Sequence, residues 1–185
     1  NIYFKIRDNK LQMTVCNRSN DMIWGAYGAN AVHMSVLQEY IAAALELEMG
    51  PYYQISDSFH VYENAQWELL KDNAKLGTLT KFMWYPETVP LVDHPVSFVY
   101  ECQHFVERLC KLNWNLETNT FDSVSYRNSF FNKVLEPMVN TFICHKERNY
   151  VKAQQFISEI QAEDWEISCG NWINTRRTNY ESKNA

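Results

Sequence analysis

The fold of this chain is decided by residues 17–30, which read NRSNDMIWGAYGAN. They follow two short runs, residues 2–6 and 11–15, in which apolar and polar side chains alternate. Such alternation predicts two strands with one buried face, and Asp8-Asn9 between them predicts the tight turn of a hairpin. The two glycines and the small polar residues of 17–30 then predict a loop whose backbone approaches a ligand.

Helix and strand patterns continue on the C-terminal side of this loop. Apolar residues at helical spacing predict a buried helix over residues 31–47, which Gly50-Pro51 ends. Residues 52–62 have the composition of a strand, residues 64–75 that of a short helix, and residues 76–95 that of a long connection containing prolines. We therefore expect an α/β fold, of the α+β kind, in this part.

The character of the chain changes at Pro95. Beyond it, three amphipathic helices are predicted, over residues 96–112, 128–144 and 150–162. Pro137 should kink or interrupt the second of these helices, because proline lacks a backbone N–H. We expect two parts, residues 1–95 with the sheet and residues 96–185 as a helical subdomain packed on it.

Composition and charge limit the classes of function. With 46% hydrophobic and 15% aromatic residues, the chain has ample material for a packed core. Its formal net charge of -5 argues against duplex nucleic acid as a partner, although one arginine can still hold the phosphate of a small ligand. No run approaches the roughly 18 apolar residues of a membrane span, so no membrane association is expected. Five cysteines without a C-x-x-C pair predict reduced thiols in a cytoplasmic protein, and no metal site is expected.

A group of polar residues along the first 62 positions predicts a nucleotide site. Arg18 and Ser19 at the end of a strand can hold a phosphate by charge-assisted and hydroxyl hydrogen bonds. The amide of Asn30 offers a donor and an acceptor, which match the O4 and N3–H edge of uracil. His60 and Tyr62 are two residues apart on a strand and therefore point to the same side. Together they can hold the phosphate, base and sugar of one nucleotide.

Each of these residues also has a structural explanation. The sequence Arg18-Ser19-Asn20-Asp21 is typical of a capped loop, since Ser, Asn and Asp favour turns for local reasons. His60 can be a hydrogen-bonded structural histidine. Asn30 can simply cap the helix that follows it.

The order of these residues resembles a known family signature. The residues Arg18-Ser19-Asn20-Asp21, then Gly25, Asn30 and Gly50, and the His60-x-Tyr62 pair resemble the pyrimidine-binding signature of thymidylate synthases and their relatives, the deoxyuridylate and deoxycytidylate hydroxymethylases. The resemblance covers about residues 1–64. It implies a thymidylate-synthase-like sheet with helices on one face, residues 1–95 being the C-terminal part of a catalytic domain, and an added C-terminal helical subdomain. It also implies a homodimer packed through its sheets.

The resemblance implies a reaction and roles for named residues. The reaction is transfer of a one-carbon unit from 5,10-methylenetetrahydrofolate to C5 of a deoxypyrimidine monophosphate, with a methyl or a hydroxymethyl product. Arg18 and Ser19 would hold the 5'-phosphate, Asn30 the base, and His60 and Tyr62 the sugar hydroxyl. The folate site would include Asp21, which anchors the pterin ring, and Gly25, which lets the backbone come close to the ligands.

Two departures from the family pattern affect this assignment. The loop between Gly25 and Asn30 is one residue longer than in the family, so a gap-free count places Ala29 at the base-reading position. We prefer Asn30, because the spacings to Gly50 and His60 agree with it. Relatives that favour cytosine tend to carry Asp at this position, so Asn30 favours uracil.

The second departure concerns the nucleophile. The family's catalytic cysteine precedes the hairpin, and matching Asp8 to its counterpart puts that cysteine a few residues upstream of Asn1, on a preceding segment or a separate chain. Cys16 has no neighbouring base or helix start to activate it. The other cysteines considered are predicted to be core residues on apolar helix faces: Cys102, Cys110 and Cys144. The chain alone would thus lack the nucleophile, and a non-catalytic nucleotide-binding or assembly protein is the alternative.

Overall fold

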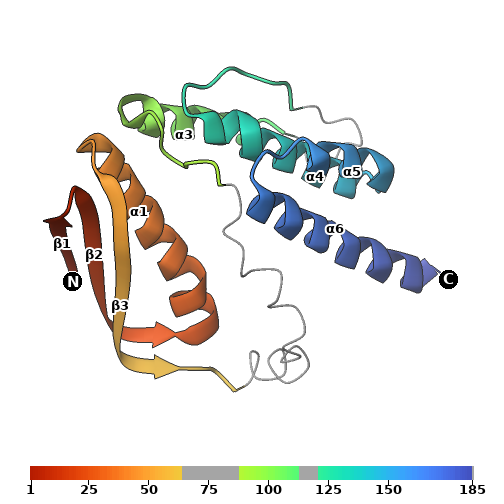
Figure 1. Ribbon diagram of the computed structural model, residues 1–185. Coiled ribbons are helices and arrows are strands. Elements are labelled where there is room, and N and C mark those ends of the chain that lie inside the picture. Colours follow the sequence, from red (N-terminus) through yellow and green to blue (C-terminus); the bar gives the residue numbers. More distant parts are fainter. Residues whose placement is uncertain (64–87, 113–120, 185) are drawn as a thin grey trace. The chain divides into compact units, whose positions relative to one another are not determined.

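The computed structural model describes residues 1–63, 88–112 and 121–184 (Figure 1). The chain forms two compact units, Asn1–Trp84 and Tyr85–Ala185. The fold is α+β: a three-stranded sheet and one long helix in the first unit, and helices in the second. The predicted boundary at residue 95 coincides with the start of the first described helix of the second unit, not with the division between the units. The short helix predicted over residues 64–75 lies outside the described residues.

The sheet is built on the predicted hairpin. Strands β1 (Ile2–Arg7) and β2 (Lys10–Asp21) pair antiparallel. The two turn residues, Asp8 and Asn9, have φ angles of 50° and 58°, the left-handed values that a two-residue hairpin turn requires. Strand β3 (Glu48–His60) runs parallel to β2 on its other side. The hairpin and the third strand are therefore confirmed. The buried face predicted for both runs is present only in β2, because all six residues of β1 are exposed.

Helix α1 (Asn30–Ala44) packs on one face of the sheet, where the alternating side chains Leu11, Met13 and Val15 are buried. A buried glutamine of this helix, Gln38, fixes it to the strands: its Nε2 donates to the carbonyl oxygens of Leu11 (2.8 Å) and Gly50 (3.0 Å). A Cβ on Gly50 would lie 2.8 Å from the Leu11 oxygen, so a glycine is needed at this close approach. These contacts join α1 to the starts of β2 and β3.

The prediction of a loop over residues 17–30 is wrong. Strand β2 continues to Asp21, and residues Met22–Ala29 form a wide helical turn, η1, that leads into α1. The Asp21 carboxylate accepts a hydrogen bond from the backbone N–H of Trp24 and so caps this turn. The small polar residues continue the strand because their side chains find partners on β3, which local turn preferences do not reveal.

The second unit is helical, as predicted. Its first helices are α3 (Pro95–Cys110), and η3 (Phe131–Leu135) continued by α4 (Glu136–Lys146). The predicted interruption at Pro137 is confirmed, since the helix changes from η3 to α4 at residue 136. Pro137 lies in the first turn of α4, where the missing N–H is tolerated.

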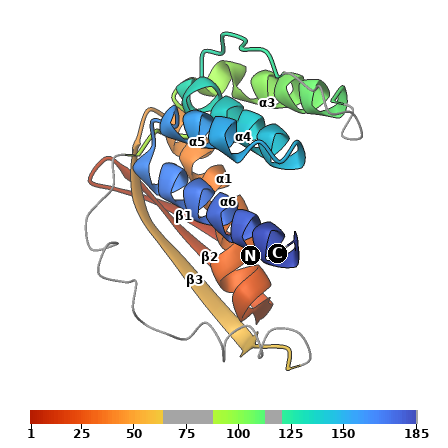
Figure 2. The same cartoon turned by 90° about the vertical axis from the view of Figure 1, so that its right-hand side faces the viewer.

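Two further helices complete the described part of this unit, α5 (Tyr150–Ser158) and α6 (Glu163–Asn184). They pack side by side, and α5 also packs on α4 (Figure 2). Helix α6 was not predicted. Its sequence is mostly polar, and only a few apolar side chains such as Ile173 are buried against its neighbours.

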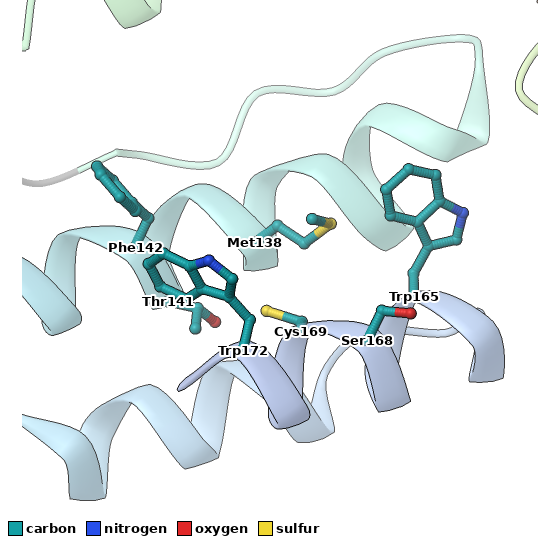
Figure 3. A pocket seen from close by; sticks show the side chains of 7 residues that line it. All are labelled: Met138, Thr141, Phe142, Trp165, Ser168, Cys169 and Trp172. Atoms are coloured by element: carbon teal, nitrogen blue, oxygen red, sulfur yellow. The ribbon is translucent and has the colours of Figure 1, made fainter. Parts of the chain in front are cut away.

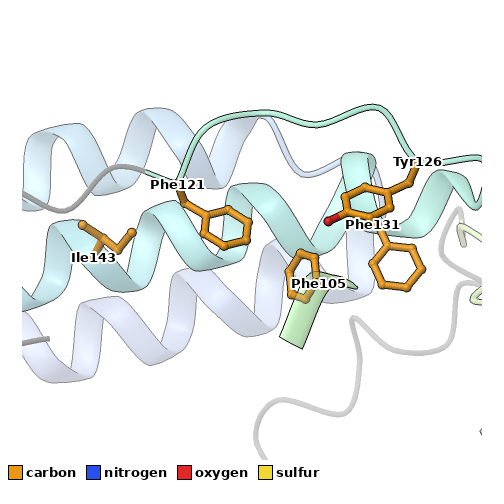
Figure 4. Close-up of a cluster of buried hydrophobic side chains, with 5 residues drawn as sticks. All are labelled: Phe105, Phe121, Tyr126, Phe131 and Ile143. Atoms are coloured by element: carbon orange, nitrogen blue, oxygen red, sulfur yellow. The ribbon is translucent and has the colours of Figure 1, made fainter. Parts of the chain in front are cut away.

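Aromatic side chains form the main core of the helical unit. Phe105 of α3 contacts rings from the extended segment before η3 and from η3 itself; the buried members are Phe105, Phe121, Tyr126, Phe131 and Ile143 (Figure 4). A buried carboxylate, Glu101, ties the same segment to α3. It accepts hydrogen bonds from the backbone N–H groups of Arg127 (2.8 Å) and Asn128 (3.0 Å) and from Asn128 Nδ2 (2.7 Å).

Across residues 1–63, 88–112 and 121–184, none of the helices combines the length and the apolar character needed to cross a membrane.

Candidate nucleotide site

The predicted phosphate and sugar residues meet at one edge of the sheet. Strands β2 and β3 are parallel, so their carboxyl ends lie together, and Asp21 is the register partner of His60. Arg18 and Ser19 lie near the end of β2, and both are exposed. Tyr62 follows two residues after His60, and their rings make an edge contact with centroids 5.0 Å apart. Arg18, Ser19, Asp21, His60 and Tyr62 therefore all lie at or near the carboxyl ends of these two paired strands.

Asn30 reaches this edge from the start of α1. Its backbone is already helical, with φ -66° and ψ -43°, and the residue in the capping position is Ala29, whose side chain makes no capping hydrogen bond. The Asn30 side chain instead donates from Nδ2 to Asn20 Oδ1 over 3.0 Å. The side chain of Asn30 is thus turned toward the strand end and does not act as a helix cap.

A buried amide network lies below Asn30. Asn20 is 1% exposed, and its Nδ2 donates to Gln54 Oε1 and to Ser56 Oγ, the latter over 3.0 Å. Gln54 Nε2 donates in turn to the carbonyl oxygen of Ala26 in η1, over 3.2 Å. The network therefore joins β2, β3, η1 and α1. Sequence reasoning gave Asn20 no role and did not notice Gln54; polar side chains at alternate positions of the predicted strand 52–62 were the available signal.

The two residues assigned to the folate are engaged within the protein. Gly25 is buried, and a Cβ there would collide with Asn20 Oδ1 and lie 3.1 Å from Asn30 Nδ2. Asp21 uses Oδ1 to cap the turn at Trp24. The glycine thus makes room for the amide network, and the carboxylate holds the start of η1.

The part of the chain that contains these residues is similar to a known family. The family model that matches is the one described as thymidylate synthase, and it covers residues 1–79. This range includes the whole strand-end cluster, which consists of Arg18, Ser19, Asp21, Asn30, His60 and Tyr62. Residues 1–79 of this chain are thus similar to the thymidylate synthase family.

Among individual relatives, a deoxyuridylate hydroxymethyltransferase of Pseudomonas phage M6 is 36% identical over 96% of the chain and 51% of its own length. A deoxyuridylate hydroxymethyltransferase of Bacillus phage SP01 is 52% identical over 32% of the chain and 15% of its own length. A putative thymidylate synthase of Methanosarcina acetivorans is 40% identical over 39% of the chain and 32% of its own length. The chain thus spans about half of the M6 protein and less of the others. No solved structure matches significantly.

The cysteines of the chain are placed as structural residues, with one exception. Cys144 is buried and Cys102 half-buried, as predicted. Burial raises the pKa of both thiols, and also that of Cys169, which disfavours the thiolate that a nucleophile needs. Cys110 is exposed at the last position of α3, so its prediction as a core residue was wrong. It comes directly after Leu109, which packs on the core, and therefore points about a quarter-turn away from the apolar face.

A hollow also exists in the helical unit, but its chemistry does not suit a nucleotide. It lies between α4 and α6, has a volume of about 310 Å³, and is lined by Met138, Thr141, Phe142, Trp165, Ser168, Cys169 and Trp172 (Figure 3). No charged side chain lines it, so it offers nothing to a phosphate. The strand-end cluster is the better candidate, because it combines an arginine, hydroxyls, a histidine and an oriented amide.

Proposed function

We propose that the protein containing this chain transfers a one-carbon unit to C5 of deoxyuridine monophosphate, as a hydroxymethyltransferase. The observation that carries the proposal is the Asn30 amide, held by Asn20 at the edge of the sheet where Arg18 and His60 also lie. The printed names of the M6 and SP01 relatives support deoxyuridylate as the substrate and hydroxymethyl as the product. The methyl product of a thymidylate synthase is the alternative outcome.

In this proposal each part of the nucleotide has its own contacts. Arg18 and Ser19, both exposed near the end of β2, bind the 5'-phosphate by charge-assisted and hydroxyl hydrogen bonds. His60 and Tyr62 bind the sugar hydroxyl. Asn30 binds the base, with its amide oxygen accepting from N3–H and its amide nitrogen donating to O4.

The proposed carbon donor is 5,10-methylenetetrahydrofolate. When bound, it supplies the electrophilic methylene carbon that C5 attacks. Asp21 and Gly25 are proposed for the folate site on the family resemblance; in the structure one Asp21 oxygen caps η1, and Gly25 is buried beside Asn20 and Asn30. The donor is proposed on the similarity to the thymidylate synthase family.

The proposed nucleophile is a cysteine that is not among the five of this chain. A thiolate must add to C6 of the base before C5 becomes reactive enough to accept the carbon unit. Burial raises the pKa of Cys102, Cys144 and Cys169, which is the opposite of what such a nucleophile requires. A cysteine supplied by a segment preceding the hairpin, or by a separate chain, fits the family pattern.

A homodimer packed through its sheets is part of the proposal. On the sheet face away from α1, apolar side chains are more than half exposed in β1 and β3: Tyr3 (54%), Tyr53 (53%) and Ile55 (56%). They alternate with the side chains that face α1, such as Gln54. A second copy of the same surface can cover them in a symmetric interface.

The experiment is a product assay on the full-length protein. It is incubated with deoxyuridine monophosphate and 5,10-methylenetetrahydrofolate, and the nucleotide product is identified by mass spectrometry. We expect the mass of the hydroxymethyl nucleotide. The mass of thymidylate would instead identify a synthase, and tight nucleotide binding without any product would favour a non-catalytic binder. A protein that neither binds deoxyuridine monophosphate nor forms any product would refute the proposal.

A further inference from the structure

The orientation of the Asn30 amide can be traced back to a backbone carbonyl. The carbonyl oxygen of Ala26 can only accept a hydrogen bond, so the Gln54 group that faces it must be Nε2. The Gln54 oxygen then faces Asn20, which must donate to it from Nδ2. Asn17 Nδ2, at 3.5 Å, is a second donor toward the same Gln54 oxygen.

The next hydrogen bond in this series of side-chain amides joins Asn20 to Asn30, the residue proposed to contact the base. Because Asn20 uses Nδ2 toward β3, its Oδ1 faces Asn30 and accepts from Asn30 Nδ2 at 3.0 Å. One N–H of Asn30 is thereby used. Among the described residues, this leaves Oδ1 and the second N–H of Asn30 for a base, in one fixed order.

Turning the Asn30 amide over would break this order at every step. The Asn30 oxygen would then face the Asn20 oxygen, and turning Asn20 as well would bring its oxygen against Gln54 Oε1. Turning Gln54 too would bring its oxygen against the Ala26 carbonyl. Asn20 is buried, so water cannot compensate for oxygens placed against each other.

We propose that Asn20 and Gln54 are the positioning residues that make this site select uracil over cytosine. Uracil presents N3–H and O4, which match the fixed Asn30 oxygen and N–H; cytosine presents N3 and an N4 amino group, which require the amide turned over. The inference rests on the proposed function, because it takes Asn30 as the residue that contacts the base. It assigns base choice to Asn20 and Gln54, the relay that orients Asn30, as well as to Asn30 itself.

The test compares two nucleotides in the full-length protein. Dissociation constants for deoxyuridine and deoxycytidine monophosphate are measured by calorimetry for the wild type and for Asn20→Leu and Gln54→Met, which replace the relay amides by apolar groups of similar size. We expect the wild type to prefer the uracil nucleotide, and each variant to lower that preference roughly tenfold, since Asn30 is free to turn. Gln54 is only half-buried, so Gln54→Met keeps the test available if Asn20→Leu does not fold.

Gln38→Met is the matched control. Gln38 is a buried glutamine of the same unit, but it binds the starts of β2 and β3, away from the strand ends. It should lower stability and leave the preference between the two nucleotides unchanged. An unchanged preference in folded Gln54→Met, or a wild type that binds both nucleotides equally, would overturn the relay and leave the proposed function standing. A wild type that binds neither nucleotide would overturn both.

Discussion

At the scale of single residues, the candidate site depends on the space around one buried amide. Asn20 fits between β3 and α1 only because Gly25 has no side chain. The family signature contains both residues, but the spacing of a signature does not say that one makes room for the other. Packing at Gly25 and charge at Arg18 can be tested separately.

Gly25→Ala should destabilise the protein by about 1–3 kcal/mol, the usual cost of forcing an added group into a packed site. The new methyl group would displace Asn20 Oδ1 and crowd Asn30 Nδ2. Gly170→Ala in α6 is the control, because the nearest atom to its added Cβ is Ile157 Cγ2 at 3.9 Å, an ordinary contact. That change should stabilise α6 by about 0.5–1 kcal/mol. Urea unfolding measures both, and equal effects of the two variants would contradict the packing described.

Arg18→Ala should weaken binding of deoxyuridine monophosphate by about 1.5–3 kcal/mol, the range for a hydrogen bond to a charged group. Arg18 is exposed, so the free energy of unfolding should hardly change. Calorimetry with the nucleoside deoxyuridine provides the control, since it lacks the phosphate and should bind the variant and the wild type alike. If the variant loses affinity for both ligands equally, Arg18 does not act on the phosphate.

At the scale of elements, local patterns predicted the strands and most helices. Alternation predicted β1 and β2, and helical spacing predicted α1, α3 and α5. In β2 the alternating apolar residues are buried, whereas all six residues of β1 are exposed. The loop over residues 17–30 was wrong because Asn20 is satisfied by Gln54, which is 34 positions away in the sequence. For the same reason the sequence did not predict the relay of Asn20 and Gln54. The spacing of Arg18 to His60 indicated a nucleotide site, but no local rule pairs Asn20 with Gln54.

The link between α3 and the segment at residues 127–128 should depend on pH through Glu101. Burial alone would raise the pKa of this carboxyl, but hydrogen bonds from Asn128 and Arg127 outweigh it and lower the pKa below its usual 4.5. A lowered pKa means that the stabilisation is complete above the unfolded value and is lost as the pH falls through the folded value. Acid should therefore weaken this link.

Glu101→Gln tests this dependence in the full chain. At pH 7 the variant should unfold at lower urea concentration than the wild type, because an amide cannot accept hydrogen bonds at both of its terminal atoms. The difference should shrink as the pH falls below 4.5, because the wild-type carboxyl is then progressively protonated as well. Glu107→Gln, an exposed position on the same helix, is the control and should change stability by no more than about 0.5 kcal/mol at either pH. A pH-independent effect of Glu101→Gln would refute the role of the charge.

At the scale of the whole molecule, the two units differ in which known proteins they are similar to. The thymidylate synthase model ends at residue 79, within the first unit, whereas the alignment with the M6 hydroxymethyltransferase covers 96% of the chain and so extends through the helical unit. The nucleotide residues all lie in the first unit. The helical unit has its own aromatic core, and it lies within the region that is similar to the M6 protein.

The most direct test of the central claim is a crystal structure of the full-length protein with deoxyuridine monophosphate. The account predicts the base on the Asn30 amide, with N3–H toward Oδ1, the phosphate on Arg18 and Ser19, and the sugar beside His60 and Tyr62. Asn20 should keep its hydrogen bonds to Asn30 and Ser56. A nucleotide bound elsewhere, for example in the hollow between α4 and α6, or one bound at the strand ends with Asn30 turned away from the base, would contradict it.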